Sequence, residues 1–334
     1  MCSARYMKKK ILQTLIGVLA VFLGLGIFSP VLAYEIEKLA NIPVTNDFTL
    51  GPGKVEIFID PGAKQTRNLL ITNRLGKEMK FKVEIEDFEG SPTGEVAAVL
   101  LGGKKGPYSL RDYLYPEITE FALAHGERMV LPVEISIPEG IEPGGLYGSV
   151  LISTAPAVKE LEEEEEASKG QIQIKGRIGS LFFVRIKGEA SEEGRLEKFD
   201  TVGSKRFYQK MLISFNVLYR NTGNVHLNPY GVIEIKNLLG KKVDEIEIEP
   251  YFAMPKSLRY IEKKWDKDLG LGFYTATLSL NRGYKDIIDT AKISFWILPW
   301  KILLFAGIII FFVIFLIWWS VTHFEIRKKQ PKAP

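Results

Sequence analysis

Residues 218 to 231, LYRNTGNVHLNPYG, place three asparagines and a histidine within fourteen positions, a crowding of polar groups that can form a catalytic or metal site. His226, however, has no other histidine, cysteine or acidic residue near it in the sequence. The segment Asn221-Thr222-Gly223-Asn224 consists of residues that form side-chain turns and accept left-handed backbone conformations. We therefore interpret the stretch as a turn between two extended segments.

Other groups that could perform catalysis are equally isolated. A serine nucleophile needs a histidine and an orienting acid. Residues 34–297, which we predict below to lie outside the cell, hold only His125 and His226, and these fall in two different predicted domains. Glu84 and Glu86 lie on the solvent face of a predicted strand, although acid-base work by carboxylates that the fold brings together stays open. The sequence has no Gly-rich phosphate loop before a helix, no HExxH and no Asp-rich calcium loop. We predict no catalytic residues, no metal and no cofactor.

Residues suited to contact a ligand are concentrated in GGKKGPYSLRDYLYPE, residues 102 to 117, where three tyrosines stand among basic side chains in a predicted long connection. Aromatic faces with hydrogen-bonding neighbours suit a glycan or protein contact, and loops on a rigid sandwich commonly carry function. The alternative is that this loop packs its tyrosines back onto the core. The predicted binding residues are Tyr108, Arg111, Tyr113, Tyr115 and Tyr147.

The N-terminal segment predicts export from the cell. Three lysines, residues 8–10, precede an apolar run from Ile11 to Phe28, and Pro30 and small residues up to Ala33 follow. This order predicts a signal peptide over residues 1–33 that is cleaved after Ala33. An uncleaved anchor is the alternative, and Met7 is an alternative start to Met1.

A second apolar segment lies near the other end of the chain. Ile302 to Val321 are twenty residues without a charge, enough to span about 30 Å of hydrocarbon as a helix. Tryptophans flank the segment on both sides, as is usual at membrane interfaces. We predict a single transmembrane helix over residues 298–321, a basic cytoplasmic tail over 322–334, and residues 34–297 outside the cell.

Charge and cysteine content limit what the exterior region can bind. The whole chain carries a net charge of +4, but residues 34–297 hold 35 basic and 39 acidic residues and are therefore acidic. A nucleic-acid partner would need a concentrated basic face, so none is predicted. The single cysteine, Cys2, precedes the apolar run, which excludes disulfides, thiol catalysis and cysteine zinc sites from the mature exterior region.

Apolar and polar residues alternate along most of the exterior region, which is the pattern of strands that have one buried face. Turn signals separate the short runs, so we predict an all-β ectodomain of two tandem immunoglobulin-like antiparallel β-sandwiches, residues 34–188 and 189–297. GEASEEGR, residues 188–195, would join them. Because the last strand runs almost directly into the anchor, the second sandwich must sit close to the bilayer. Its predicted strands are 210–219, 231–236, 242–249, 273–280 and 291–297.

The acidic run Glu162 to Glu166 is the most biased segment of the chain. It follows the apolar strand 147–154 and precedes an alternating segment around Ile172 and Ile174, which places it at the tip of a long predicted hairpin. Five like charges repel one another and favour a solvated loop. An electrostatic contact with a basic partner, or weak binding of divalent cations, is the alternative.

Three segments in order resemble the N-terminal domain of Gram-positive WxL-interacting cell-surface proteins. The segment FNVLYRNTGNVHLNPYGVIEIKNLLGKKV, residues 215–243, is similar to the membrane-proximal sandwich that follows it in that family. The resemblance implies a peptidoglycan-binding immunoglobulin-like module that docks glycan or partner proteins. The chain departs from the family at Gly145 to Gly148, where relatives often have an aromatic pair, and at the acidic run. The three segments are FTLGPGKVEIFIDPGAKQTRNLLITN (48–73), EITEFALAHGERMVLPVEISIPEGIEPGGLYGSVLIST (117–154) and GRIGSLFFVRIKGE (176–189).

Three hypotheses of function follow. The first is a membrane-anchored scaffold that binds peptidoglycan or a secreted surface protein through its first sandwich. The second is a chaperone-like assembly module that pairs an open sheet edge with a strand of its partner. The third, which the isolated polar residues disfavour, is a cell-wall hydrolase. A cytoplasmic tail of about a dozen residues is too short to fold, so signalling by this chain alone is not expected.

Overall fold

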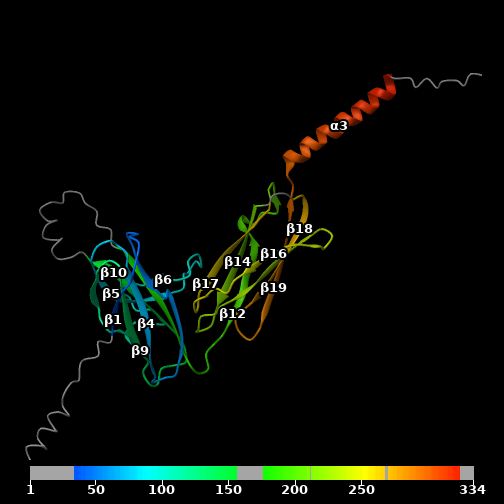
Figure 1. Ribbon diagram of the computed structural model, residues 1–334. Coiled ribbons are helices and arrows are strands. Elements are labelled where there is room, and N and C mark those ends of the chain that lie inside the picture. The colour runs from blue at the N-terminus through cyan, green and yellow to red at the C-terminus, as the bar shows by residue number, and fades with distance from the viewer. Residues whose placement is uncertain (1–33, 156–175, 211, 268–269, 324–334) are drawn as a thin grey trace, which may run out of the picture.

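The computed structural model describes residues 34–155, 176–210, 212–267 and 270–323 (Figure 1). The predicted signal peptide, the acidic run Glu162 to Glu166, the segment around Ile172 and Ile174, and the end of the basic tail therefore lie outside the described residues.

The first domain consists of two sheets that pack face to face around one core. One sheet has the order β1-β9-β4-β2, and β7 also pairs with β9; the other has the order β3-β11-β10-β5-β6, and β8 also pairs with β5. The strands of the first sheet are β1 (Glu35–Lys38), β2 (Phe48–Gly51), β4 (Lys64–Asn73), β7 (Leu114–Pro116) and β9 (Glu127–Ser136). Those of the second are β3 (Lys54–Ile59), β5 (Met79–Glu89), β6 (Val99–Leu100), β8 (Glu120–Leu123), β10 (Gly144–Ala155) and β11 (Arg177–Ile186).

The second domain is also a two-sheet sandwich. Its sheets have the orders β12-β14-β17 and β13-β19-β18-β15-β16. The strands of the smaller sheet are β12 (Gly194–Thr201), β14 (Leu212–Asn221) and β17 (Leu258–Asp266). Those of the larger are β13 (Phe207–Tyr208), β15 (Tyr230–Asn237), β16 (Lys242–Ile248), β18 (Gly272–Asn281) and β19 (Ile288–Ile297). The prediction of two tandem all-β sandwiches is confirmed, and β12, β13 and β17 are additions to the predicted strands.

Two strand pairs depart from the predicted antiparallel arrangement. β3 pairs parallel to β11, and the short β13 pairs parallel to β19. In each case a segment far from its partner in sequence joins the edge of a sheet, so the parallel pairing needs no tight turn. The other strand pairs within the described residues are antiparallel.

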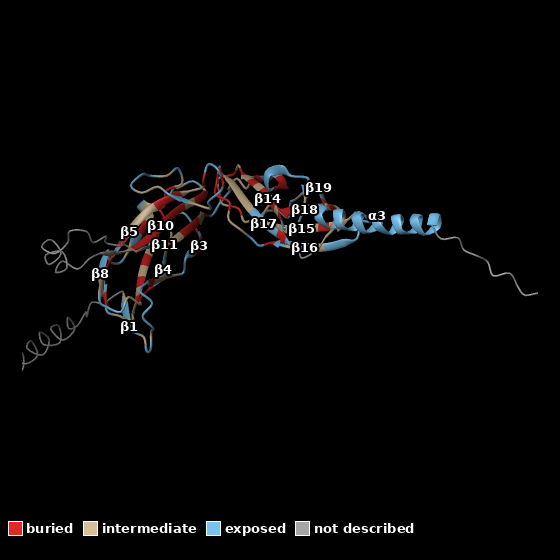
Figure 2. Ribbon diagram, turned by 90° about the horizontal axis from the view of Figure 1, so that it is seen from above, coloured by how far each residue is buried: buried red, intermediate tan, exposed pale blue. Residues whose placement is uncertain are grey.

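Alternation of burial along the strands builds a separate core in each domain. In β9, Met129, Leu131, Val133 and Ile135 are fully buried while the residues between them are half-buried. β14 repeats this pattern, and Figure 2 shows buried residues along the strands of both sandwiches. Because each core is complete in itself, the hydrophobic effect holds each domain together separately, and further contacts are needed to join them.

An apolar helix, α3 (Trp300–His323), extends from the far end of the second domain (Figure 1). It begins three residues after β19 ends at Ile297, and the apolar side chains described in the helix are exposed (Figure 2). By length and composition, the segment Leu304–His323 is apolar enough to cross a membrane. The apolar helix lies where the sequence predicts it.

Asparagine side chains brace the turns that follow several strands. At the end of β14, the side chain of Asn221 donates to the carbonyls of Val225 and Ala253 and accepts from the N–H of Gly223, at 2.8, 2.9 and 2.9 Å. Asn73, which ends β4, is similarly buried and bonded, and Asn237, which ends β15, braces an exposed turn. The interpretation of residues 221–224 as an asparagine-braced turn is therefore confirmed.

We expect Asn221→Ala to lower the free energy of unfolding by about 3 kcal/mol, because it removes three buried hydrogen bonds and leaves the Val225 carbonyl without its side-chain partner. The matched substitution Asn237→Ala, in an exposed turn where water replaces the lost bonds, should cost about 0.5–1 kcal/mol. Urea unfolding of the detergent-solubilised chain measures both values. Equal losses in the two variants would contradict the structural role assigned to Asn221.

Candidate functional site

An aromatic cluster joins the two domains. Phe88 of β5, Tyr147 of β10 and Phe183 of β11 form a small buried group together with Met254, which lies between β16 and β17. The ring of Phe183 meets those of Phe88 and Phe252 edge-to-face, with centroids 5.3 and 5.0 Å apart. Edge-to-face packing of this kind adds to the stabilisation from buried area, so the cluster fixes the second domain against the β10-β11 face of the first.

A hydrogen bond between Tyr147 and His226 crosses the same interface. The backbone N–H of His226 donates to the hydroxyl oxygen of Tyr147 at 2.6 Å, and that oxygen lies 3.2 Å from Nδ1 of the imidazole. On the other side of the ring, Nε2 is 3.5 Å from a carboxylate oxygen of Glu56. This geometry suits the neutral tautomer with its proton on Nε2.

Burial keeps His226 neutral. Removal from water lowers the pKa of His226 to about 4, against the opposing effect of the nearby Glu56 carboxylate. Burial likewise raises the pKa of the Tyr147 hydroxyl far above its ordinary value. Both groups are therefore uncharged at neutral pH and act as hydrogen-bonding parts of the interface.

Backbone contacts on either side of the aromatic cluster complete the joint. The N–H of Gly145 donates to the carbonyl of Asn224 at 3.0 Å, and the Asn224 side chain donates to Pro143. On the other side, the N–H of Tyr260 in β17 donates to the carbonyl of Gly94 at 2.9 Å. A side chain at Gly90 would come within 2.4 Å of Ser257, so this close approach requires glycine there. The interface between the two domains, which we call the joint, is thus held by hydrogen bonds at Gly145 and at Gly94 as well as by the aromatic cluster.

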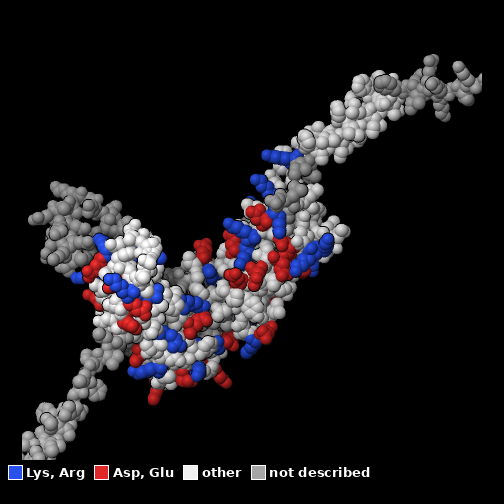
Figure 3. Space-filling model, viewed as in Figure 1, with Lys and Arg blue, Asp and Glu red and all other residues white. Residues whose placement is uncertain are grey.

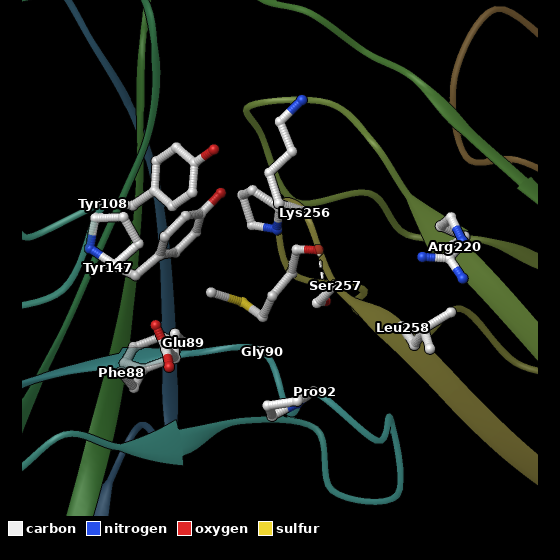
Figure 4. A pocket seen from close by; sticks show the side chains of 13 residues that line it. Phe88, Glu89, Gly90, Pro92, Tyr108, Tyr147, Arg220, Lys256, Ser257 and Leu258 are labelled. Carbon is white, nitrogen blue, oxygen red and sulfur yellow. Dashed lines mark hydrogen bonds between the residues drawn. The ribbon is translucent and has the colours of Figure 1, made fainter.

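A pocket of about 380 Å³ opens between these contacts (Figure 4). Figure 4 shows the rings of Tyr108 and Tyr147 beside each other on the first-domain side, facing the segment that carries Lys256 and Ser257. The pocket lies within the size range of small-ligand sites and is bounded by both domains. The lining consists of residues 88–90, 92, 107, 108 and 147 from the first domain and residues 220 and 254–258 from the second.

The charged groups of the pocket differ in how they are compensated. Arg220 is 3.0 Å from the Glu197 carboxylate, so its charge is already paired. Lys256, whose ammonium group donates to the backbone carbonyl of Thr222, forms no ion pair among the described residues. Lys256 is therefore the cation of the pocket that is best placed to meet an acidic ligand group.

Asp87 positions the loop that carries Tyr108. Its fully buried carboxylate accepts from the backbone N–H groups of Gly106, Leu110 and Arg111 at 3.0, 3.2 and 3.0 Å. These bonds tie the loop after β6 back to β5. Charge-assisted bonds to a buried carboxylate are stronger than neutral ones, so the loop has one defined conformation in which Tyr108 reaches the pocket.

The structure separates the predicted binding residues into two groups. Tyr108 and Tyr147 meet at the pocket with ring centroids 6.2 Å apart, and Tyr147 is fully buried. Arg111 instead donates to Gly103, and Tyr113 packs against the first core. Tyr115 is 53% exposed, and its hydroxyl donates to the carbonyl of Asp112. The loop therefore combines the predicted contact surface with the alternative of packing onto the core.

Sequence reasoning did not identify Phe88, Phe252, Met254 or Lys256 as site residues. The only local signal was the apolar PYFAMP, residues 250–255, which lies between strands where polar turn residues are usual. His226, interpreted from sequence as part of a turn, also contributes to the interface between domains. Among the described residues, no group of three or more His, Cys, Asp or Glu side chains could hold a metal ion.

We expect the stability of the chain to depend on His226 in mildly acidic solution. The folded state holds this histidine at a pKa of about 4, below its ordinary value of 6.5, so the unfolded state binds more protons between these values. The contribution of His226 is therefore complete above pH 6.5 and is lost as pH falls toward 4. Between pH 7.5 and 4.5 the wild-type chain should lose about 2.5 kcal/mol more than His226→Gln.

Urea unfolding of both chains at the two pH values measures this difference. The carboxylates that also titrate in the window are common to both proteins and cancel in the comparison, except for Glu56, which is paired with His226. Parallel losses in the two chains would show that His226 is not held neutral at the interface.

No family model matches the chain, and no curated protein matches its sequence. Solved structures with a similar arrangement of strands include the class 5 fimbriae chaperone CfaA, with 11% identity and a TM-score of 0.36 over 75% of this chain and 100% of the other. Others are the E. coli chaperone DraB, with 12% identity, a TM-score of 0.33 and coverages of 75% and 96%, and the chaperone YadV, with 10%, 0.36, 74% and 100%. At these scores no function is transferred to this chain.

Proposed function

We propose that this chain is a membrane-anchored extracellular binding protein that holds a segment of a partner protein in the pocket between its two domains. The observation that carries this proposal is that both domains line the pocket and are fixed against each other around it. The apolar helix α3 would be the anchor, with residues 34–297 outside the cell and the basic tail in the cytoplasm. The proposed role is binding without catalysis.

The pocket suits a short peptide segment that carries an apolar and an acidic group. Phe88, Tyr108 and Met254 offer an apolar and aromatic surface, and Lys256 lies across from them. Aromatic anchors in a desolvated pocket, with a charged group at its rim, are typical of the residues that dominate protein interfaces. A fixed pocket also avoids the cost of ordering loops on binding.

The resemblance to WxL-interacting proteins implies a related role, in which the first sandwich docks wall peptidoglycan or a secreted surface protein. Tyr115 supports a contact outside the pocket, because its ring is exposed while its hydroxyl is held by the Asp112 carbonyl. A rigid, exposed aromatic face is suited to stacking against a sugar ring. Tyr115 lies in β7, seven residues after Tyr108, so the two sites can be tested separately.

Photo-crosslinking on intact cells tests the proposal. A photoreactive phenylalanine analogue replaces one tyrosine at a time: Tyr108 in the pocket or the exposed Tyr115 of β7. Tyr230, an exposed tyrosine of the second domain, is the matched control. We expect a discrete protein adduct from position 108 and none from position 230. Muropeptide adducts from position 115 alone would support wall docking and contradict the pocket.

Substitution of Lys256 gives a quantitative measure. Lys256→Ala should reduce capture of the partner crosslinked at position 108 about threefold, because it removes the exposed cation at the rim of the pocket, where a charge pair contributes less than a desolvated one. Arg220→Ala, which removes a cation already paired with Glu197, is the control and should reduce capture much less. Equal capture by all three chains would exclude the pocket as the binding site.

A second candidate function is pairing with a partner strand along β3. The carbonyls of Gly53 and Ile59 accept from Leu181 and Lys187, so the odd-numbered residues of this segment face β11. Within the described part of the chain β3 pairs only with β11, so the backbone groups of its even-numbered residues point away from the sheet. Phe58, at one of these outward positions, is 60% exposed. An open edge of this kind can accept an added strand.

Phe58→Pro tests this candidate because it removes an outward N–H without breaking a bond to β11. If the edge accepts a partner strand, Phe58→Pro should abolish partner capture in pull-downs from culture supernatant. Phe58→Ala, which keeps the N–H, should retain most of it. Unchanged capture by a folded Phe58→Pro chain, with folding monitored by circular dichroism, would exclude strand addition at β3.

A further inference from the structure

Large apolar side chains are exposed around the end of the second domain from which α3 emerges. Leu238 and Leu239 are 70% and 89% exposed, and Phe207 and Leu271 are 67% and 57% exposed. Neither domain core needs them, because each core is complete without these residues. Trp296 and Trp300, which flank the chain segment between β19 and α3, are also partly exposed.

Strand register places these residues at one level of the sandwich. Gly272 pairs with Ile297, the last residue of β19, and Phe207 pairs with Trp296. Asn237, which ends β15, pairs with Tyr274, so the turn that follows it extends toward the level of Gly272 and Ile297. Exposed residues of β13, of the turn after β15 and of the segment before β18 therefore lie near the point where the chain enters α3. We call Phe207, Leu238, Leu239, Leu271, Trp296 and Trp300 the apolar end.

The turn that carries the two leucines is firmly built. The side-chain oxygen of Asn237 accepts from the N–H groups of Leu239 and Lys241 at 3.0 and 3.1 Å, and its backbone N–H donates to the carbonyl of Lys241. Gly240 adopts a positive φ of 75°, which closes the turn. The leucines are thus held outward by a turn whose polar groups are satisfied, and they do not fold back onto the sandwich.

The short connection to α3 brings the apolar end to the membrane surface. Only Leu298 and Pro299 separate Ile297 from Trp300, which limits the distance between those two residues to about 10 Å. The charge-free apolar run begins at Ile302, directly after Lys301, so Trp300 lies at its interfacial end. The end of the sandwich must then lie at the depth of the lipid headgroups if α3 crosses the bilayer.

The charges at this end complement a lipid surface. Four exposed lysines lie around the apolar end: Lys205, Lys210, Lys241 and Lys301. Figure 3 shows basic side chains where the second domain meets the helix. Lysines beside exposed leucines and tryptophans are the combination found in proteins that lie in the interface of anionic membranes.

We propose that the apolar end of the second domain docks on the bilayer that α3 crosses, with Leu238 and Leu239 inserted at the level of the lipid headgroups. This inference rests on the membrane anchoring proposed above and does not depend on what the interdomain pocket binds. The docked end gives the ectodomain a second membrane contact besides the helix, so its orientation is set by the lipid surface.

Site-directed fluorescence on the full chain tests the docking. Leu239→Cys and Ile288→Cys, each in a Cys2→Ser background, are labelled with an environment-sensitive fluorophore and reconstituted into phosphatidylcholine and phosphatidylglycerol liposomes. Ile288 is a matched control because it is an apolar residue, 59% exposed, at the opposite end of β19. Both positions are exposed, so neither substitution disturbs a core.

We expect lipids with a spin label near the headgroup to quench the label at position 239 at least about twofold more than that at position 288. Aqueous iodide should show the reverse preference. Equal lipid quenching at both positions overturns the docking, as does protection of position 239 from iodide without lipid quenching, which would indicate a protein cover. Flotation of the liposomes reports anchoring separately, because a chain that fails to float contradicts the anchor itself.

Discussion

The contact between Tyr147 and the segment around His226 is the constraint on which the arrangement of the two domains depends. Each sandwich has its own core, so burial within the cores does not determine how the domains sit relative to each other. The tyrosine hydroxyl satisfies a backbone N–H that would otherwise be buried without a partner. Around this bond, the rings of Phe88, Phe183 and Phe252 exclude water and make the joint specific.

The pocket exists because the two domains contact each other on two sides of their interface and leave space between these contacts. The contact at Gly145 lies on one side and the contact at Gly94 on the other, and Tyr108 stands between them on a loop held by Asp87. A change in the angle between the domains would alter both walls of the pocket together. Its shape therefore belongs to the joint as much as to either domain.

The alternating pattern predicted strands well where every second residue is apolar, as in β9 and β14, and failed where the pattern is interrupted. A bulge between Leu196 and Lys198 shifts the register of β12, and Lys263 occupies an inward-phase position of β17. For the site, sequence identified Tyr108 and Tyr147. It could not pair Tyr147 with His226, because these residues are 79 positions apart and only the fold brings them together.

The two-residue connection between β19 and α3 has a mechanical consequence when it is combined with the fixed joint between the domains. A long flexible stalk would let the pocket sample many heights above the cell surface. Here folded protein spans nearly all of the distance between α3 and the pocket, so that distance is fixed. With α3 anchored in a membrane as proposed, a partner of the pocket would be met within a narrow layer above the lipid, and insertions in the connection would move that layer outward without changing the pocket.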